Sequence, residues 1–132
     1  MSGLDILSSR VILRPADHEL TLAFYRDALG LAIAREYPGG TVFFAGQSLI
    51  EVAGGGRPGA AVRFAGALWL QVRDLAEARR SLTEAQVPIV REAKVEPWGL
   101  REMWIADPDG VAIVLVEVPP DRPIRRDTRW DA

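Results

Sequence analysis

The residue types that could carry out chemistry are few in this chain of 132 residues. It contains no cysteine, which excludes a cysteine nucleophile, a zinc–thiolate site and a disulfide framework. The single histidine, His18, lies next to a predicted helix start without a visible partner that would orient it as a base. Asp107 and Asp109 belong to an Asp-Pro-Asp-Gly run, in which aspartate typically hydrogen-bonds the backbone of its own turn. Tyr25 falls within a predicted helix and Tyr37 beside a Pro-Gly-Gly loop, so we assign a catalytic role to neither.

The charged residues do not point to a polyanionic partner or to a membrane. The formal net charge is −2, and the arginines are scattered without forming a basic face, so nucleic-acid binding is not expected. Every apolar stretch is shorter than the roughly 18 residues of a membrane span, and the first residues do not form a secretory signal. We therefore expect a cytoplasmic protein without a membrane partner.

The elements that must position any site follow one order in the first half of the chain. Four segments have the β-branched and apolar composition of strands: residues 10–14, 31–36, 41–45 and 48–52. Between the first two, residues 17–29 predict a helix that Asp17 caps. The buried stripe of this helix is expected to consist of four apolar residues at helical spacing: Leu20, Ala23, Phe24 and Ala28.

The same order returns in the second half. Strands are predicted at four segments: residues 67–72, 87–92, 100–106 and 111–118. A second helix follows Asp74, which has Glu77 at the spacing of a capping box. Leu13 and Leu70 are 57 residues apart, as are Asp17 and Asp74, which indicates two copies of one unit.

We predict one α+β domain over residues 1–132, built from two βαβββ repeats at about 8–53 and 65–118. A Gly-rich linker at about 54–61 would join the repeats. Its consecutive glycines are not expected to bind phosphate, because they lack the Lys-Ser/Thr of a phosphate-binding loop. Residues 119–132 have the composition of an extended C-terminal tail.

Three motifs carry a resemblance to a known family. They are Phe24-Tyr25-Arg26-Asp27-Ala28-Leu29-Gly30-Leu31, Pro97-Trp98-Gly99-Leu100-Arg101 and Asp107-Pro108-Asp109-Gly110. In this order on a doubled βαβββ frame, they resemble the vicinal oxygen chelate superfamily, which contains glyoxalases, bleomycin-resistance proteins and extradiol dioxygenases. The resemblance covers about residues 8–118 and implies two curved mixed sheets that form a half-open cup around a ligand. It also implies a homodimer.

The resemblance further implies where a metal site would lie. In metal-dependent members the ligands come from the first and last strands of each repeat, and these positions fall here on Arg10, Glu51, Ala67 and Val114. Only Glu51 is a good ligand, whereas divalent metals in open sites need about three imidazole or carboxylate donors. We predict that the metal site is lost and that no cofactor is bound; a divalent metal is the alternative. If Arg10 and Glu51 face the same cup, an ion pair stands in place of the metal and a ligand could use it. The alternative is a structural or partly solvated pair at the rim of the cup.

An apolar wall is expected around these positions. Strand alternation places four more residues on the same face: Ile12, Leu49, Trp69 and Val116. Trp98, Met103 or Trp104 would line or cover the mouth of the cup, and core packing is the alternative for each tryptophan. Arg101 would either contact an anionic ligand or hold its own loop.

These features favour a protein that binds and sequesters an aromatic or amphipathic small molecule, as in antibiotic resistance of the bleomycin-resistance type. Arg10 would donate to a ligand carboxylate, phosphate or carbonyl, while Glu51 would accept from a ligand amine or hydroxyl. The alternative is a lyase, isomerase or dioxygenase-type enzyme acting on a small carbonyl or hydroxy compound, with Glu51 as base or metal ligand. A third reading is a regulatory subunit that recruits a protein partner.

Overall fold

The computed structural model of the chain describes residues 3–54 and 64–120. These residues fall into two compact units, with the division between Phe64 and Ala65. The predicted linker at about 54–61 lies outside the described residues except for Gly54, and the predicted tail does so from residue 121 onward. No helix of the described part of the chain is long and apolar enough to cross a membrane.

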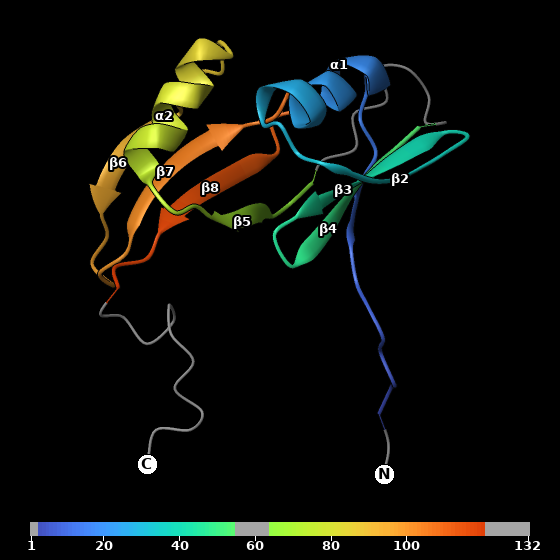
Figure 1. Ribbon diagram of the computed structural model, residues 1–132, viewed down its shortest axis with the longest axis horizontal. Coiled ribbons are helices and arrows are strands. Elements are labelled where there is room, and N and C mark those ends of the chain that lie inside the picture. Colours follow the sequence, from blue (N-terminus) through green and yellow to red (C-terminus); the bar gives the residue numbers. More distant parts are fainter. Residues whose placement is uncertain (1–2, 55–63, 121–132) are drawn as a thin grey trace. The chain divides into compact units, whose positions relative to one another are not determined.

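The first unit is one four-stranded mixed sheet with a helical segment (Figure 1). Its elements are β1 (Val11–Leu13), α1 (His18–Ala23), the π-helical turn η1 (Phe24–Ala28), β2 (Ile33–Tyr37), β3 (Gly40–Ala45) and β4 (Ser48–Ala53). The strand order is β1-β4-β3-β2; β1 runs parallel to β4, and the other neighbours are antiparallel.

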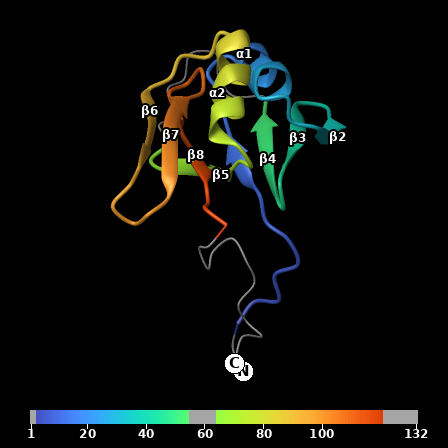
Figure 2. The same cartoon turned by 60° about the vertical axis from the view of Figure 1, so that its left-hand side comes forward.

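The second unit repeats this arrangement. Its elements are β5 (Ala67–Gln71), α2 (Leu75–Glu84), β6 (Arg91–Val95), β7 (Arg101–Ala106) and β8 (Ala112–Glu117). The order β5-β8-β7-β6 again pairs the first strand with the last in parallel, and α2 lies alongside β7 and β8 of its own sheet (Figures 1 and 2). The predicted α+β class and the two βαβββ repeats are confirmed.

Side-chain caps fix where both helices begin. The Asp17 carboxylate accepts a hydrogen bond from the Leu20 amide, and the Asp74 carboxylate accepts one from the Glu77 amide, both at 3.1 Å. In the second unit, Glu117 of β8 also accepts from the backbone N–H of Leu75 at 2.8 Å. A carboxylate at a helix start satisfies an N–H group that has no partner within the helix. This bond therefore ties α2 to the end of its sheet.

The first helix differs from its prediction in the face that it buries. Thr21 and Tyr25 are its buried residues, whereas Leu20 is more than half exposed. The helix changes from α to π winding at Phe24, and a wider turn shifts the phase of every later side chain. Thr21 and Tyr25 are four residues apart and share one face of the helix. The Tyr25 ring packs near Phe43 of β3, with 6.4 Å between ring centroids. The expected apolar stripe was thus wrong in phase.

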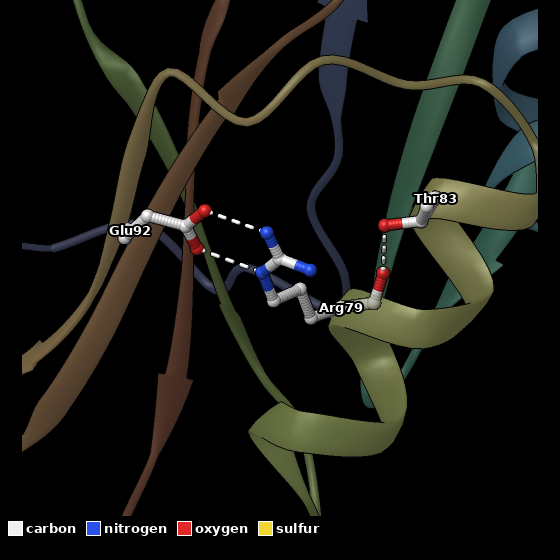
Figure 3. A network of polar contacts seen from close by, with 3 residues as sticks. All are labelled: Arg79, Thr83 and Glu92. Carbon is white, nitrogen blue, oxygen red and sulfur yellow. Dashed lines mark hydrogen bonds and ion pairs between the residues drawn. The ribbon is translucent and has the colours of Figure 1, made fainter.

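The second helix is fastened to the edge strand β6 by a bidentate ion pair (Figure 3). Arg79 donates from Nε and Nη2 to the two carboxylate oxygens of Glu92, at 2.8 and 2.7 Å. Thr83 donates its hydroxyl to the Arg79 carbonyl one turn earlier, at 2.9 Å. Because both side chains of the pair are largely solvent-exposed, we expect this contact to orient the helix more than to stabilise the unit.

Strand β6 begins later than predicted, at Arg91 instead of residue 87. Gln86 adopts a left-handed conformation with φ of 61°, and the Val87 amide donates back to the Leu82 carbonyl at 2.9 Å. Val87 therefore closes the end of α2 and is buried there. Its apolar character belongs to the helix terminus and not to a strand.

Each sheet has one face packed against its helix and one that we call the open face. In the first unit the helix-packed face carries the buried side chains of Leu13, Phe43, Ile50 and Val52. In the second unit it carries Leu68, Met103, Ile105, Ile113 and Leu115. Since side chains alternate along a strand, the residues between these positions form the open faces.

Candidate functional site

The open face of the first unit contains the predicted ion pair. Ile12 of β1 lies opposite Glu51 of β4 in the parallel ladder, and Arg10 immediately precedes β1. Arg10 Nη1 donates to Glu51 Oε1 at 3.0 Å. The side chain of Glu51 is 13% exposed and that of Arg10 33% exposed, so the carboxylate is the more enclosed partner.

Tyr37, to which the sequence assigns no catalytic role, completes this cluster. The Tyr37 hydroxyl donates to Glu51 Oε2 at 2.5 Å, so each carboxylate oxygen accepts one hydrogen bond from the chain itself. Tyr37 can lie there because it pairs across the β2–β3 hairpin with Gly40, where an added Cβ would overlap the tyrosine ring. In the sequence, this contact is indicated by a tyrosine and a glycine that can face each other across a short hairpin.

These contacts set the protonation of the cluster. The hydrogen bond from Tyr37, followed by the hydrogen bond and charge of Arg10, holds the pKa of Glu51 below its ordinary value. The same hydrogen bond raises the pKa of Tyr37, because the phenolate would lie against a carboxylate. Glu51 is therefore a stabilised anion and a weak base, which disfavours the predicted role of Glu51 as a general base.

A second guanidinium stands beside the cluster. Arg35 lies opposite Val42, which in turn lies opposite Glu51, so the three residues cross the sheet in one row. The Arg35 guanidinium carbon is 5.7 Å from the centre of the Tyr37 ring. The open face of the first unit thus combines two guanidinium groups with one carboxylate.

The open face of the second unit is apolar and buried at its centre, where Val114 and Val116 cluster with Trp104 packed against them, and it also carries Glu102 opposite Val116. Trp69 lies opposite Val114, which lies opposite Trp104, and Arg91 follows on the edge strand. Trp69 corresponds to Ile12 at the repeat spacing of 57 residues, so the register makes Val114 the counterpart of Glu51. Ala67 likewise occupies the place of Arg10 and is exposed. The sequence-based assignment of equivalent positions agrees with both ladders.

Two carboxylates on this unit were not expected. Glu102 is buried and accepts from the indole N–H of Trp98 at 2.7 Å. Glu96 is also buried and pairs with Arg91, whose Nη2 is 2.6 Å from the carboxylate. Trp98 occupies the tip of the β6–β7 hairpin and is 60% exposed. This exposed position is compatible with the predicted place of Trp98 at the mouth of the cup. The sequence does not indicate that Glu102 anchors Trp98, because it shows only a glutamate within an apolar strand.

Two predicted ligand residues lie on the other face of the sheet. Met103 is fully buried at 0% exposure and lies opposite Leu115 on the helix-packed side. Arg101 has the same alternation as Met103 and lies opposite Glu117, whose carboxylate faces the start of α2. Trp104, the next residue along β7 after Met103, has the opposite alternation and lies opposite Val114 on the open face. These placements argue against ligand contacts by Met103 and Arg101.

His18 is partly buried and not a freely solvated surface residue as expected. Its Nδ1 is enclosed and has no hydrogen-bond partner among the described residues. Nδ1 would lie 3.4 Å from a Cβ built on Gly54. His18 does not reach the cluster of Arg10, Glu51 and Tyr37 through any contact in the described part of the chain.

A family model for the glyoxalase/bleomycin resistance protein/dioxygenase superfamily matches residues 8–115. The chain belongs to this superfamily. A comparison with curated proteins gives no significant match.

Solved structures share the fold. A superfamily member from Sphaerobacter thermophilus is 25% identical, with a TM-score of 0.67 over 86% of this chain and 98% of its own. A lactoylglutathione lyase from Agrobacterium tumefaciens is 19% identical, with a TM-score of 0.64 over 88% and 96%. TioX from Micromonospora sp. ML1 is 19% identical, with a TM-score of 0.68 over 88% and 99%. The chain therefore spans nearly the full length of these relatives.

The positions that hold a metal in metal-dependent members of the superfamily do not form a donor set here. Arg10 is a permanent cation, and Ala67 and Val114 are alkyl side chains. Glu51 already accepts from two donors of its own unit. Within residues 3–54 and 64–120, no group of three or more His, Cys, Asp or Glu side chains is placed to hold a metal ion. The residues present thus do not fit a divalent cation.

Proposed function

We propose that this superfamily member binds an aromatic or amphipathic small molecule on its open faces and sequesters it without a metal. The observation that carries the proposal is the cluster of Arg10, Glu51 and Tyr37, in which protein donors occupy the carboxylate that a metal would otherwise use. A satisfied polar cluster can orient a ligand without supplying a Lewis acid.

Exposed apolar side chains support a binding role. Ile12 is 47% exposed and Phe44 51% exposed on the open face of the first unit, and Trp69 is 45% exposed on that of the second. Large apolar residues on a sheet face that carries a few fixed polar groups are typical of sites for organic ligands. A lactoylglutathione lyase is among the structures that share this fold, but a fold does not determine a function, so the function must be inferred from the site.

Fluorescence titration tests the proposal. Bleomycin and a naphthoquinone would be titrated against the full chain while tryptophan emission is followed, with N-acetyltryptophanamide as the control for collisional quenching. We expect a saturable change for at least one of them that weakens in Trp69→Leu. A linear response indistinguishable from that of the control, for both compounds, would count against sequestration of these compound classes.

Metal analysis separates binding from the enzymatic alternative. The protein would be purified without chelator, and its content of zinc, manganese, iron and nickel measured. We expect less than about one-tenth of an equivalent, because only one of the four superfamily positions is a good donor. A stoichiometric divalent ion that Glu51→Gln removes would instead support a metal-dependent enzyme.

A further inference from the structure

We infer that the open face of the first unit selects ligands that carry an anionic group on a flat apolar body, with Arg10 and Arg35 as the residues that receive the anion. The inference rests on the proposed function and names the class of ligand that this face would take. Its basis is how the donors and acceptors of the cluster are already used.

About half of the acceptor capacity of Glu51 is already used within the protein. Its Oε1 accepts from Arg10 and its Oε2 accepts from Tyr37, whereas a carboxylate has about four acceptor sites. The side chain is only 13% exposed, so little of the remaining capacity faces an approaching ligand amine. Hydrogen bonds to a charged, partly enclosed carboxylate are among the stronger ones, so a ligand that displaced either of them would bind at a cost.

The guanidinium groups are less fully used. Arg10 contacts Glu51 through Nη1, and a guanidinium carries five N–H donors in a planar fork. Arg35 is exposed and stacks over Tyr37, and none of the ion pairs among the described residues includes it. Donors therefore outnumber acceptors on this face.

The charge balance points the same way. Arg10 and Arg35 bring two positive charges to one carboxylate, and Tyr37 adds no charge near neutral pH, where a phenol is protonated; the hydrogen bond to Glu51 raises the pKa of Tyr37 further. Next to the hydrogen bond from Tyr37, both guanidinium groups contribute to the lowered pKa of Glu51, so both act on the same point of the face. An incoming anion would find one uncompensated positive charge there.

The apolar part of the ligand class follows from the neighbouring side chains. Ile12 lies opposite Glu51. Phe44 is two residues after Val42 on β3, so it lies on the same open face. Both are about half exposed, whereas the opposite face of the same strands is buried. A flat ring placed over them would bring an attached carboxylate or sulfonate to the guanidinium groups.

Three probes with one ring system and different charges test this inference: 2-naphthoate, 2-naphthalenemethanol and 2-naphthylmethylammonium. Calorimetric titration of the full chain at pH 7.5 and low salt is expected to show about fivefold tighter binding of naphthoate than of the alcohol, as for a partly exposed ion pair. The difference should shrink at 0.5 M NaCl because the charges are screened. Arg35→Gln should remove most of the preference for naphthoate while leaving the affinity for the alcohol unchanged.

Arg26→Gln is the matched control, because it removes the same charge from the helix of the same unit, where Arg26 pairs with Asp27. Equal affinity for all three probes would overturn the anion preference and leave the proposed binding function standing. Tightest binding of the ammonium probe would also overturn it. Equal losses in Arg26→Gln and Arg35→Gln would refute the assignment to this face. Absence of binding by all three probes would overturn this inference and count against the proposed function itself.

Discussion

Replacing Met103 with alanine should destabilise the protein by about 3 kcal/mol without a direct effect on ligand affinity. The side chain is fully buried on the helix-packed face, opposite Leu115. The substitution removes three heavy atoms, which corresponds to roughly 2.4 kcal/mol of transfer free energy before a cavity is counted. Measured Met-to-Ala changes in cores lie at about 2–5 kcal/mol, and the lack of exposed surface places Met103 within that range.

Urea unfolding followed by tryptophan fluorescence measures this change. At a slope of about 1.5 kcal/mol per molar urea, the midpoint should fall by about 2 M with the slope unchanged. Arg101→Ala is the control on the same strand: Arg101 is exposed, so its free energy of unfolding should stay within about 0.5 kcal/mol of the parent. A loss below about 1 kcal/mol for Met103→Ala, together with a tenfold loss of probe affinity, would refute the assignment of the two faces of β7.

Three further predictions follow from the polar contacts. Tyr37→Phe removes the main cause of the lowered pKa of Glu51, so that pKa, measured by carbon NMR of the carboxyl group, should rise toward the ordinary glutamate value of about 4.3. A lowered carboxyl pKa stabilises the folded state at a pH above the ordinary pKa, and this stabilisation is lost as the pH falls through the lowered pKa. Tyr37→Phe should therefore make the free energy of unfolding less sensitive to acid between these two pKa values. An unchanged pKa of Glu51 and an unchanged acid sensitivity would contradict the Tyr37–Glu51 bond. Gly40→Ala should give the same NMR shift, because the new methyl group would displace the Tyr37 ring, and an unchanged pKa of Glu51 would show that the hairpin relaxes instead. Asp107→Ala should cost about 2–4 kcal/mol in the free energy of unfolding by urea, since the carboxylate accepts from two backbone N–H groups of its turn, whereas a change under 0.5 kcal/mol would argue against a structural role.

The repeat was predictable because local rules decide it. Asp17 and Asp74 are at the same place in both copies, and each accepts from the amide three residues later, as a helix N-cap does. Asp107 also behaves as its Asp-Pro-Asp-Gly context predicts, accepting from the amides of Asp109 and Val111. These contacts span at most four residues, so the types of the neighbours suffice to predict them.

The predictions failed where they depended on which face of a strand or helix a side chain takes. Met103 and Trp104 were both candidates for the ligand face, but adjacent residues of a strand point to opposite sides, and only the pairing of β7 with β8 decides which side each takes. The helical stripe failed for a similar reason, since Thr21 and Tyr25, which share a face one residue round from Leu20 and Phe24, turn toward the sheet. Apolar composition alone does not contain this information.

The missed residues depend on contacts between elements. Tyr37 is on β2 and Glu51 is on β4, and these strands are not neighbours. The two side chains meet across β3, the single strand that lies between them. From the sequence, Glu102 would be expected to be a surface charge. In the structure, the β6–β7 hairpin brings the Trp98 indole N–H within hydrogen-bond distance of its carboxylate. By contrast, the pairing of Arg10 with Glu51 followed from two superfamily positions that occupy neighbouring strands.

Each sheet takes all four of its strands from a single repeat, and this arrangement has a consequence for how the chain can form and vary. The first repeat contains every hydrogen-bonding partner of its own ladder, so its sheet can close before the second repeat has left the ribosome. Within each repeat, the parallel pairing of the first and last strands joins the segments that are most distant along the chain, so it carries the largest loop-closure cost. Substitutions on one open face therefore leave the register of the other sheet intact. A duplicated unit of this kind can acquire a charged face in one copy and an aromatic face in the other while both keep the same backbone.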